Sequence, residues 1–169
     1  ESRVHPEAMK PSVESTFHAW LLQQPGIKFI GHTHPGEVTK ILCSPAAEQF
    51  ASHRLFPDEI VCCGPQSLLL DYVNPGAELT ESIREEWSKF TRANGFSPKI
   101  ILVRNHGLIA VGETANAVMS ATIMANKAAS IFTGAAIHGK IQFMEPKEVE
   151  RIHQRLDEKY RQNQIQSQA

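Results

Sequence analysis

Apolar residues recur along the chain at spacings that predict particular elements. Between positions 12 and 24, Val13, Phe17, Trp20 and Leu21 follow the spacing of helical turns and form one apolar stripe. This pattern predicts a helix that packs one face onto a core, and the proline and glycine that follow are expected to end it. Further helices are expected over 36–43, 45–53, 75–94, 114–133 and from 146 onward.

Short apolar or alternating runs lie between these helices and predict strands. The strands are expected at 27–32, 59–63, 68–72, 99–104 and 108–111. Strands and helices alternate, and some strands follow each other directly. This order is typical of an α/β or α+β protein in which helices cover the faces of a mixed or antiparallel sheet.

Single residues mark the ends of several elements. Gly95 is expected to stop the helix before it, and Thr114 has the side chain of an N-cap. The Gln- and Ser-rich tail over 162–169 is expected to fray. The last helix is expected to turn three apolar residues inward: Val149, Ile152 and Leu156.

Composition restricts the class of protein. The chain has 169 residues, of which 41% are apolar and 21% charged. Domains typically hold roughly 100–200 residues, so a single domain over 1–169 is expected. The net charge of -1 offers no electrostatic footprint for nucleic acid or an anionic membrane. No apolar run approaches the ~20 residues of a membrane span, and the first residues lack the pattern of a signal peptide.

The cysteines indicate a reducing compartment. The chain has three of them, an odd number, and Cys62 and Cys63 are adjacent in a run that is expected to be a strand. In a strand these two side chains point to opposite faces. Buried thiols rather than a disulfide framework are therefore expected, which favours the cytoplasm.

Two histidines occur at the end of the first expected strand. His32 and His34 are separated by one residue, so in a strand they project from the same face and are close enough to share a metal ion. Pro35 ends the strand directly after them. A His-x-His pattern alone is also compatible with surface or capping histidines.

A third histidine and a glutamate extend this candidate site. His106 lies in a turn between two apolar strands, and Gly107 lets the backbone come close to a ligand. Three neutral imidazoles leave a fourth metal position open, as in catalytic sites. Glu14 lies near the start of the first helix, with His18 one turn later. Taken singly, His106 also fits a turn histidine, Glu14 a solvated glutamate and His18 a packed side chain.

Three segments in this order carry a resemblance. They are PSVESTFH at 11–18, HTHP at 32–35 and NHGLIAVG at 105–112. Together they resemble the class II aldolase/adducin family, which includes the fuculose-phosphate and rhamnulose-phosphate aldolases. The stretch DYVNPGAEL at 71–79 also resembles the segment that this family has between its second and third motifs.

The resemblance implies a fold, a reaction and a site. The fold is a three-layer α/β/α domain with a central mixed, largely antiparallel sheet. The reaction is the metal-dependent retro-aldol cleavage of a ketose phosphate or related hydroxy-ketone through a metal-stabilised enediolate. By the motif match, His32, His34 and His106 bind Zn²⁺ or another divalent ion such as Mn²⁺ or Co²⁺, and Glu14 is the general base. The resemblance further implies a homotetramer with its active sites near subunit interfaces.

Some features of the family have no match in this sequence. The chain is expected to lack the family's N-terminal segment, which carries a Gly-Asn-x-Ser-like turn for the substrate phosphate. The tyrosine general acid has no assigned counterpart, since Tyr72 and Tyr160 are the available candidates. Two alternatives stay open. One is a dehydratase, decarboxylase or epimerase of sugar phosphates on the same scaffold, and the other is a non-catalytic adducin-type interaction domain.

Overall fold

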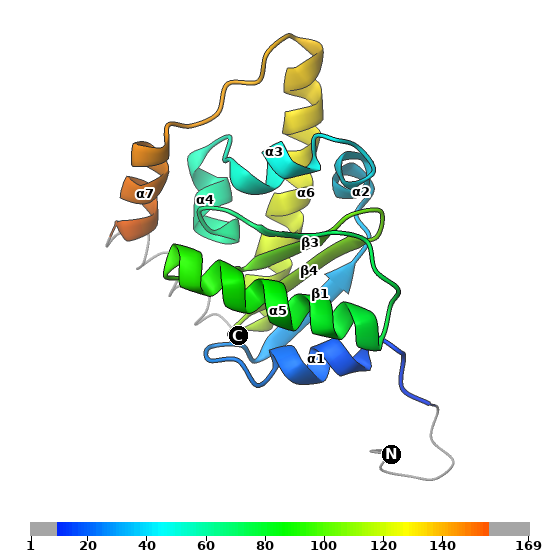
Figure 1. Cartoon of the computed structure of the whole chain (residues 1–169). Coiled ribbons are helices and arrows are strands. Elements are labelled where there is room, and N and C mark those ends of the chain that lie inside the picture. Colours follow the sequence, from blue (N-terminus) through cyan, green and yellow to red (C-terminus); the bar gives the residue numbers. More distant parts are fainter. Residues whose placement is uncertain (1–9, 156–169) are drawn as a thin grey trace.

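The computed structural model describes residues 10–155, which form seven helices and four strands (Figure 1). In chain order the elements are α1 (Ser15–Leu21), β1 (Phe29–Thr33), α2 (Gly36–Leu42), α3 (Ala47–Ser52), α4 (Pro57–Cys63), β2 (Leu68–Leu70), α5 (Ala77–Asn94), β3 (Ile100–Val103), β4 (Gly107–Gly112), α6 (Ala115–Ile137) and α7 (Pro146–Gln154). No helix in the described part of the chain is both long and apolar enough to cross a membrane.

The four strands form one mixed sheet in the order β1-β4-β3-β2. β4 pairs antiparallel with both β1 and β3, whereas β2 pairs parallel with β3. The expected mixed and largely antiparallel sheet is therefore confirmed. Because β1 lies beside β4, the end of β1 comes next to the β3–β4 turn, with Thr33 opposite Leu108.

Helices cover both faces of this sheet, which gives the expected three layers (Figure 1). The central strands are buried on both faces, so their side chains alternate between two cores. Ile100 and Leu102 pack with α2, α3 and α6 in one core, and Ile101 and Val103 pack with α1 and α5 in the other. The helices contribute five buried apolar side chains to the second core: Phe17, Leu21, Leu79, Ile83 and Trp87.

The expected strand at 59–63 is wrong, because these residues form α4. Pro57 occupies the first turn of this helix, together with Asp58 and Glu59. Proline at the first helical position and acids near the N-terminus both favour a helix start, and these signals outweigh the β-branched run that follows. The two adjacent cysteines consequently do not lie on opposite faces of a strand. Cys63 is buried and Cys62 is half-buried, and no disulfide links the three cysteines.

The expected ends of the other helices agree more closely with those in the structure. Thr114 is the N-cap of α6, since its hydroxyl accepts a hydrogen bond from the Ala117 amide at 3.1 Å. Gly95 ends α5 in the left-handed conformation, with φ 75°. α1 is shorter than the expected 12–24, and α6 continues beyond 133 to Ile137. Ile152 is buried in α7 as expected, whereas Leu156 and the tail over 162–169 lie outside the described residues.

A buried ion pair that the sequence analysis did not single out joins α3, α4 and the segment before β2. Arg54 is 1% exposed and Glu59 2% exposed, and their charged groups are 3.7 Å apart. Arg54 donates hydrogen bonds to the Gly64 carbonyl at 2.7 Å and to the Ser67 hydroxyl at 2.9 Å. Glu59 accepts one from the Leu55 amide at 2.8 Å. Burial raises the pKa of Glu59, and Arg54 opposes this shift.

Candidate metal centre

Three imidazoles meet where β1 ends beside the β3–β4 turn. His32 lies in β1, His34 follows it, and His106 is the last residue of the turn before β4. Asn105 takes a left-handed conformation in this turn, with φ 54°, which asparagine tolerates better than most residues. The pairing of β1 with β4 therefore brings together histidines that lie far apart in the sequence.

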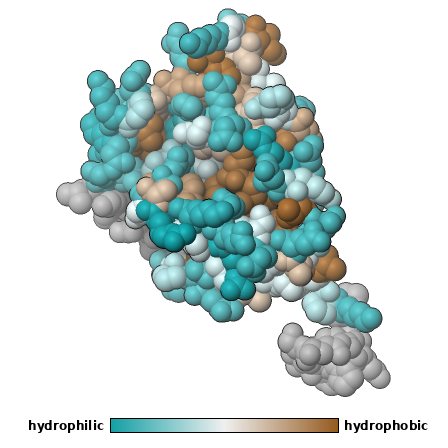
Figure 2. Space-filling model, in the orientation of Figure 1, coloured by the Kyte–Doolittle hydropathy of each residue, from teal (hydrophilic) through white to brown (hydrophobic). Residues whose placement is uncertain are grey.

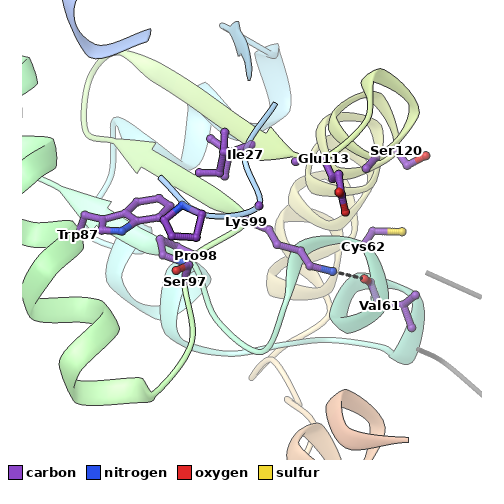
Figure 3. Close-up of a pocket in the computed structure, with 14 residues that line it drawn as sticks. Ile27, Val61, Cys62, Trp87, Ser97, Pro98, Lys99, Glu113 and Ser120 are labelled. Atoms are coloured by element: carbon purple, nitrogen blue, oxygen red, sulfur yellow. Dashed lines mark hydrogen bonds between the residues drawn. The ribbon is translucent and has the colours of Figure 1, made fainter. Parts of the chain in front are cut away.

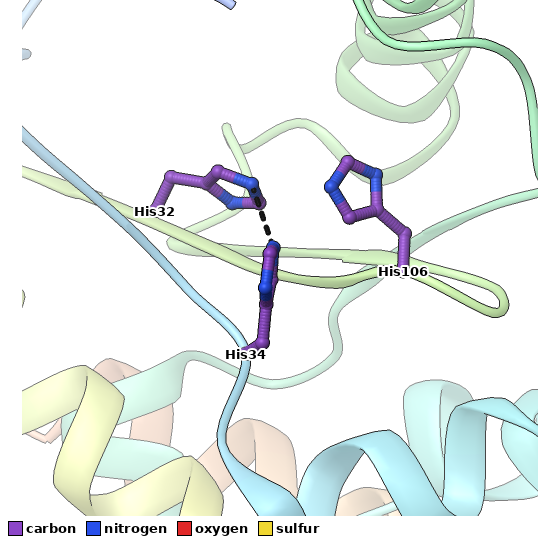
Figure 4. A group of neighbouring side chains, drawn as sticks. All are labelled: His32, His34 and His106. Carbon is purple, nitrogen blue, oxygen red and sulfur yellow. Dashed lines mark hydrogen bonds between the residues drawn. The ribbon is translucent and has the colours of Figure 1, made fainter.

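The three rings surround a common point (Figure 4). Their centroids are 4.9 Å apart for His32 and His34, and 5.0 Å apart for each of these with His106. One ring nitrogen from each residue lies within 4.8 Å of the other two. The Nε2 atoms of His32 and His34 are 3.2 Å apart. The same-face arrangement expected for the His-x-His pair is present, and His106 completes a group of three.

The orientation of His32 is fixed by the backbone of the neighbouring strand. Its Nδ1–H donates to the Leu108 carbonyl at 3.0 Å. Because a carbonyl only accepts, the Nδ1 atom carries the proton and Nε2 keeps its lone pair, which faces the other two rings. A hydrogen bond of this kind commonly orients a metal-binding imidazole. The Nδ1 atom of His106 is buried and has no hydrogen-bond partner among residues 10–155.

Glu14 brings a carboxylate to the same point. Its Oε1 atom is 3.4 Å from Nε2 of His32 and 3.3 Å from Nε2 of His106. Glu14 is the residue that immediately precedes α1, and its side chain is 23% exposed. Its backbone amide donates to the Ser12 hydroxyl at 3.3 Å, which holds the chain in place before the helix. The structure therefore unites all four residues that the sequence analysis selected.

Burial favours the neutral form of His106, the third imidazole of the site. Desolvation lowers the pKa of His106, and His32 and His34 add to this effect, whereas Glu14 opposes it. Desolvation also lowers the pKa of His18. His32 adds to this shift, and Glu14 opposes it. His18 stacks on Phe17 at 4.6 Å between ring centroids and is not part of the group of three. A neutral imidazole is the form that binds a metal ion.

Gly107 allows the chain segments that carry the histidines to lie close together. A Cβ atom at this position would lie 2.4 Å from Cδ2 of His34 and 2.7 Å from the Thr33 carbonyl oxygen. Both distances are far below van der Waals contact, so only glycine lets the end of β1 and the His34 ring pass this close to β4. The sequence had suggested a close backbone approach at this glycine. The structure shows that the group approaching it is the His34 side chain.

The donor set fits a divalent cation. Three imidazole nitrogens converge, a carboxylate is adjacent, and His34 is exposed, which leaves one side of the group open to solvent. Three protein ligands with one open side are the arrangement of catalytic metal sites, in which a position remains for substrate. Tyr72 is 53% exposed in the segment after β2 and is not part of the group, and Tyr160 lies outside the described residues.

Comparison with known proteins identifies the family. The class II aldolase and adducin N-terminal domain model matches residues 1–133. The chain belongs to this family. Class II aldolases generally use a divalent metal ion, in agreement with the group of three histidines.

The chain has several relatives within this comparison, and their names state different activities. YuxG of Bacillus subtilis (strain 168), described as an uncharacterized oxidoreductase, is 31% identical over 114 residues, which are 68% of this chain and 14% of YuxG. The structure of YgbL from Escherichia coli, a candidate aldolase, epimerase or decarboxylase, aligns with a TM-score of 0.66 at 19% identity, over 85% of this chain and 66% of YgbL. An L-fuculose 1-phosphate aldolase aligns with a TM-score of 0.66 at 18% identity, over 89% of this chain and 64% of its own. At these identities the two structures establish a shared fold.

Proposed function

We propose that this chain is a metal-dependent aldolase, a lyase that cleaves a ketose phosphate or related hydroxy-ketone by a retro-aldol reaction. The observation that carries this proposal is the convergence of three imidazoles and one carboxylate where β1 ends beside the β3–β4 turn. An interaction domain without catalysis would have no need for four such residues in contact. Membership of the class II aldolase family supports the same reaction class.

His32, His34 and His106 would hold the metal ion, with zinc as the first candidate and manganese or cobalt as alternatives. When bound, a divalent cation supplies Lewis acidity, which stabilises the negative charge that develops on substrate oxygens as the carbon–carbon bond breaks. The exposed side at His34 is the route by which a substrate would reach the group.

Glu14 would act as the proton carrier. In the cleavage direction it gives a proton to the carbon that leaves with the electron pair of the broken bond, and in the condensation direction it removes this proton as a general base. The hydroxyl group on the other side of the bond loses its proton to solvent water and becomes the carbonyl of the second product. The carboxylate is held 3.3–3.4 Å from two ring nitrogens, so it lies beside the place where the substrate oxygens would bind.

Assembly and location are part of the same proposal. We propose a cytoplasmic homotetramer that acts on a small sugar or sugar phosphate and has neither a nucleic-acid nor a membrane partner. The family relation supports the substrate class. The described surface supports association between copies, because α6 exposes several large apolar side chains.

Metal content and product analysis test the proposal together. Protein purified without chelator is expected to hold about one metal ion per chain, and a panel of ketose 1-phosphates is expected to yield an aldehyde and dihydroxyacetone phosphate in equal amounts. The double variant H32A/H34A should lose both metal and activity. His138→Ala, which removes an exposed imidazole at the end of α6, should keep both.

Each of the other outcomes contradicts a particular part of the proposal. Metal that survives in H32A/H34A would refute the ligand assignment. A product of unchanged mass, or the loss of water or carbon dioxide, would replace the aldolase reaction by epimerisation, dehydration or decarboxylation. A wild-type chain without metal would favour an interaction domain.

A further inference from the structure

A cavity of about 300 Å³ lies at the opposite end of the sheet from the imidazoles. β1 and β3 both run antiparallel to β4, and the histidines lie at the end where β1 finishes and β4 begins. The cavity is bounded by the segments before β1 and β3 and by the end of β4, with further walls from α4, α5 and α6 (Figure 3). It is therefore separate from the candidate metal centre.

Lys99 provides a cation in the wall of this cavity. Its side chain extends to the end of α4, where Nζ donates to the Val61 carbonyl at 3.0 Å (Figure 3). That carbonyl belongs to the last turn of α4, a position where a positive charge is favoured. An ammonium group has further N–H donors beyond this one bond, so Lys99 can also bind a second acceptor.

The structure gives Lys99 no counter-ion within residues 10–155. No carboxylate oxygen in this part of the chain lies within 4.0 Å of its Nζ atom. The carboxylate in the cavity wall, Glu113, pairs instead with Lys28 at 2.9 Å. Desolvation lowers the pKa of Lys99, while the thiols of Cys63 and Cys62 act in the opposite direction. A half-buried ammonium without an anion is costly, and an anionic ligand would offset this cost.

The remaining walls combine apolar side chains with the polar residues Ser97, Glu113 and Ser120. Ile27 is 8% exposed and Trp87 5% exposed, and both face the cavity with Pro98 (Figure 3). A cavity of roughly 150 Å³ is enough for one benzene ring. The volume here therefore accommodates a ring or short hydrocarbon chain together with one polar group. One ammonium without a counter-ion, beside these apolar side chains and a carboxylate that is already paired, suits a carboxylate ligand better than a phosphate, which usually needs several donors.

We propose that this cavity binds a small organic acid, whose carboxylate pairs with Lys99 and whose apolar body lies against Ile27, Trp87 and Pro98. Such a site lies outside the aldolase chemistry proposed above and does not depend on it. Occupation of the site would link the end of α4, the middle of α5 and the start of α6 with the segments before β1 and β3, all of which line the cavity.

Fluorescence of Trp87 provides a direct test. The chain has two tryptophans, and Trp20 packs against Trp87 at 6.1 Å without lining the cavity. In the Trp20→Phe variant Trp87 is the only reporter. Titration with 3-phenylpropionate is expected to change its emission saturably. The uncharged 3-phenylpropanol, of nearly the same shape, should bind at least about tenfold more weakly, because it lacks the charge-assisted bond.

Variants of two lysines separate the site from general charge effects. In the same background, Lys99→Met removes the ammonium at similar length and should abolish the preference for the acid over the alcohol. Lys89→Met removes an exposed ammonium from the same helix as Trp87 and should leave the preference unchanged. The H32A/H34A variant should also bind the acid normally, which excludes binding of the carboxylate at the histidines.

The proposal is overturned if the acid gives no saturable response, if the alcohol binds as tightly, or if Lys99→Met binds the acid as wild type does. Circular dichroism establishes whether Lys99→Met is folded. Should it not fold, the wild-type chain still decides the question by ligand-observed NMR with 3-phenylpropylamine. An ammonium in place of the carboxylate must prevent binding beside Lys99, and equal binding of amine and acid would refute the site.

Discussion

The carboxylate of Glu14 lies between two imidazoles, a position that suits either a proton carrier or a metal ligand. As a helix N-terminal carboxylate, Glu14 would contribute only ~0.3–1 kcal/mol to stability. As a general base it would contribute a factor of about 10²–10⁴ in rate. These magnitudes are different enough for a single substitution to separate the two roles.

Glu14→Gln is expected to lower turnover at least about a hundredfold, because the amide keeps the shape of the side chain and cannot carry the proton. Metal content and thermal midpoint should stay nearly unchanged. The measurements are steady-state kinetics, elemental analysis and thermal unfolding. Glu37→Gln, in the first turn of α2, is the matched control and should retain full activity.

Either of two other outcomes would revise the role of Glu14. Normal turnover in Glu14→Gln would make it a structural residue before α1. Loss of the metal would make the carboxylate a ligand in the resting state, which could act on the proton only after the substrate displaces it.

Gly107 is the residue on which the compact geometry of the histidines depends. Gly107→Ala is expected to weaken metal affinity about tenfold or more, because the new Cβ would overlap the His34 ring and the Thr33 carbonyl. Competition with a coloured chelator measures this affinity. Gly36→Ala, two residues after His34 and with no heavy atom within 4 Å of the new Cβ, should bind metal as the wild type does. Equal affinities for the two variants would contradict the close approach at Gly107.

At the scale of elements, the buried pair of Arg54 and Glu59 connects α3, α4 and the start of β2. The guanidinium donates to backbone carbonyls at the end of α3 and after α4, and to a hydroxyl before β2. These bonds satisfy polar groups that would otherwise be buried without partners. The pair thus fixes the path of a segment whose helix the apolar pattern alone does not predict.

Arg54→Ala is expected to lower the free energy of unfolding by about 3–5 kcal/mol, since it leaves Glu59 buried without its partner. Arg84→Ala removes an exposed arginine that pairs with Glu81 within α5, and should cost less than about 1 kcal/mol. Urea denaturation measures both values. The double variant R54M/E59L should recover most of the lost stability, because it removes both charges. A small effect of Arg54→Ala alone would show that water solvates Glu59 in the folded state.

At the scale of the whole molecule, α6 presents an apolar face that the described chain does not cover. Met119, Ile123 and Ile131 are spaced by multiples of four residues and are 60%, 62% and 41% exposed. Figure 2 also shows hydrophobic surface near the end of α6, where Ile137 is 81% exposed. Several large apolar side chains exposed along one helix favour an interface between subunits.

Ile123→Glu is expected to break the proposed tetramer, because it places a charge on this apolar face of α6. Light scattering should give about four times 18.8 kDa for the wild type and a smaller mass for the variant, with an unchanged circular dichroism spectrum. Leu22→Glu, at another exposed apolar residue, 49% exposed after α1, should leave the mass unchanged. A wild-type mass equal to one chain would refute the tetramer.

Periodicity along the sequence was sufficient to identify most elements. Helices and strands have repeats of a few residues, so local patterns such as Phe17 with Leu21 already determine which face is buried. Caps and stops act over one turn, which is why Thr114 and Gly95 were assigned correctly. The same local geometry predicted that His32, in β1, and His34, directly after it, project to the same side of the chain.

Tertiary structure decided what depends on distant contacts. Pro57 and the acids after it favour the start of α4, and packing onto α7 together with the buried Arg54 pair stabilises as a helix an apolar run that resembles a strand. The approach of His106 to His32 depends on the pairing of β1 with β4, and the clearance at Gly107 depends on the register of that pairing. The cavity beside Lys99 is formed by residues from separate elements. Such contacts depend on how loops bring distant segments together and on how the faces of helices and sheets pack. The periodic pattern of apolar residues within one element does not encode either of these.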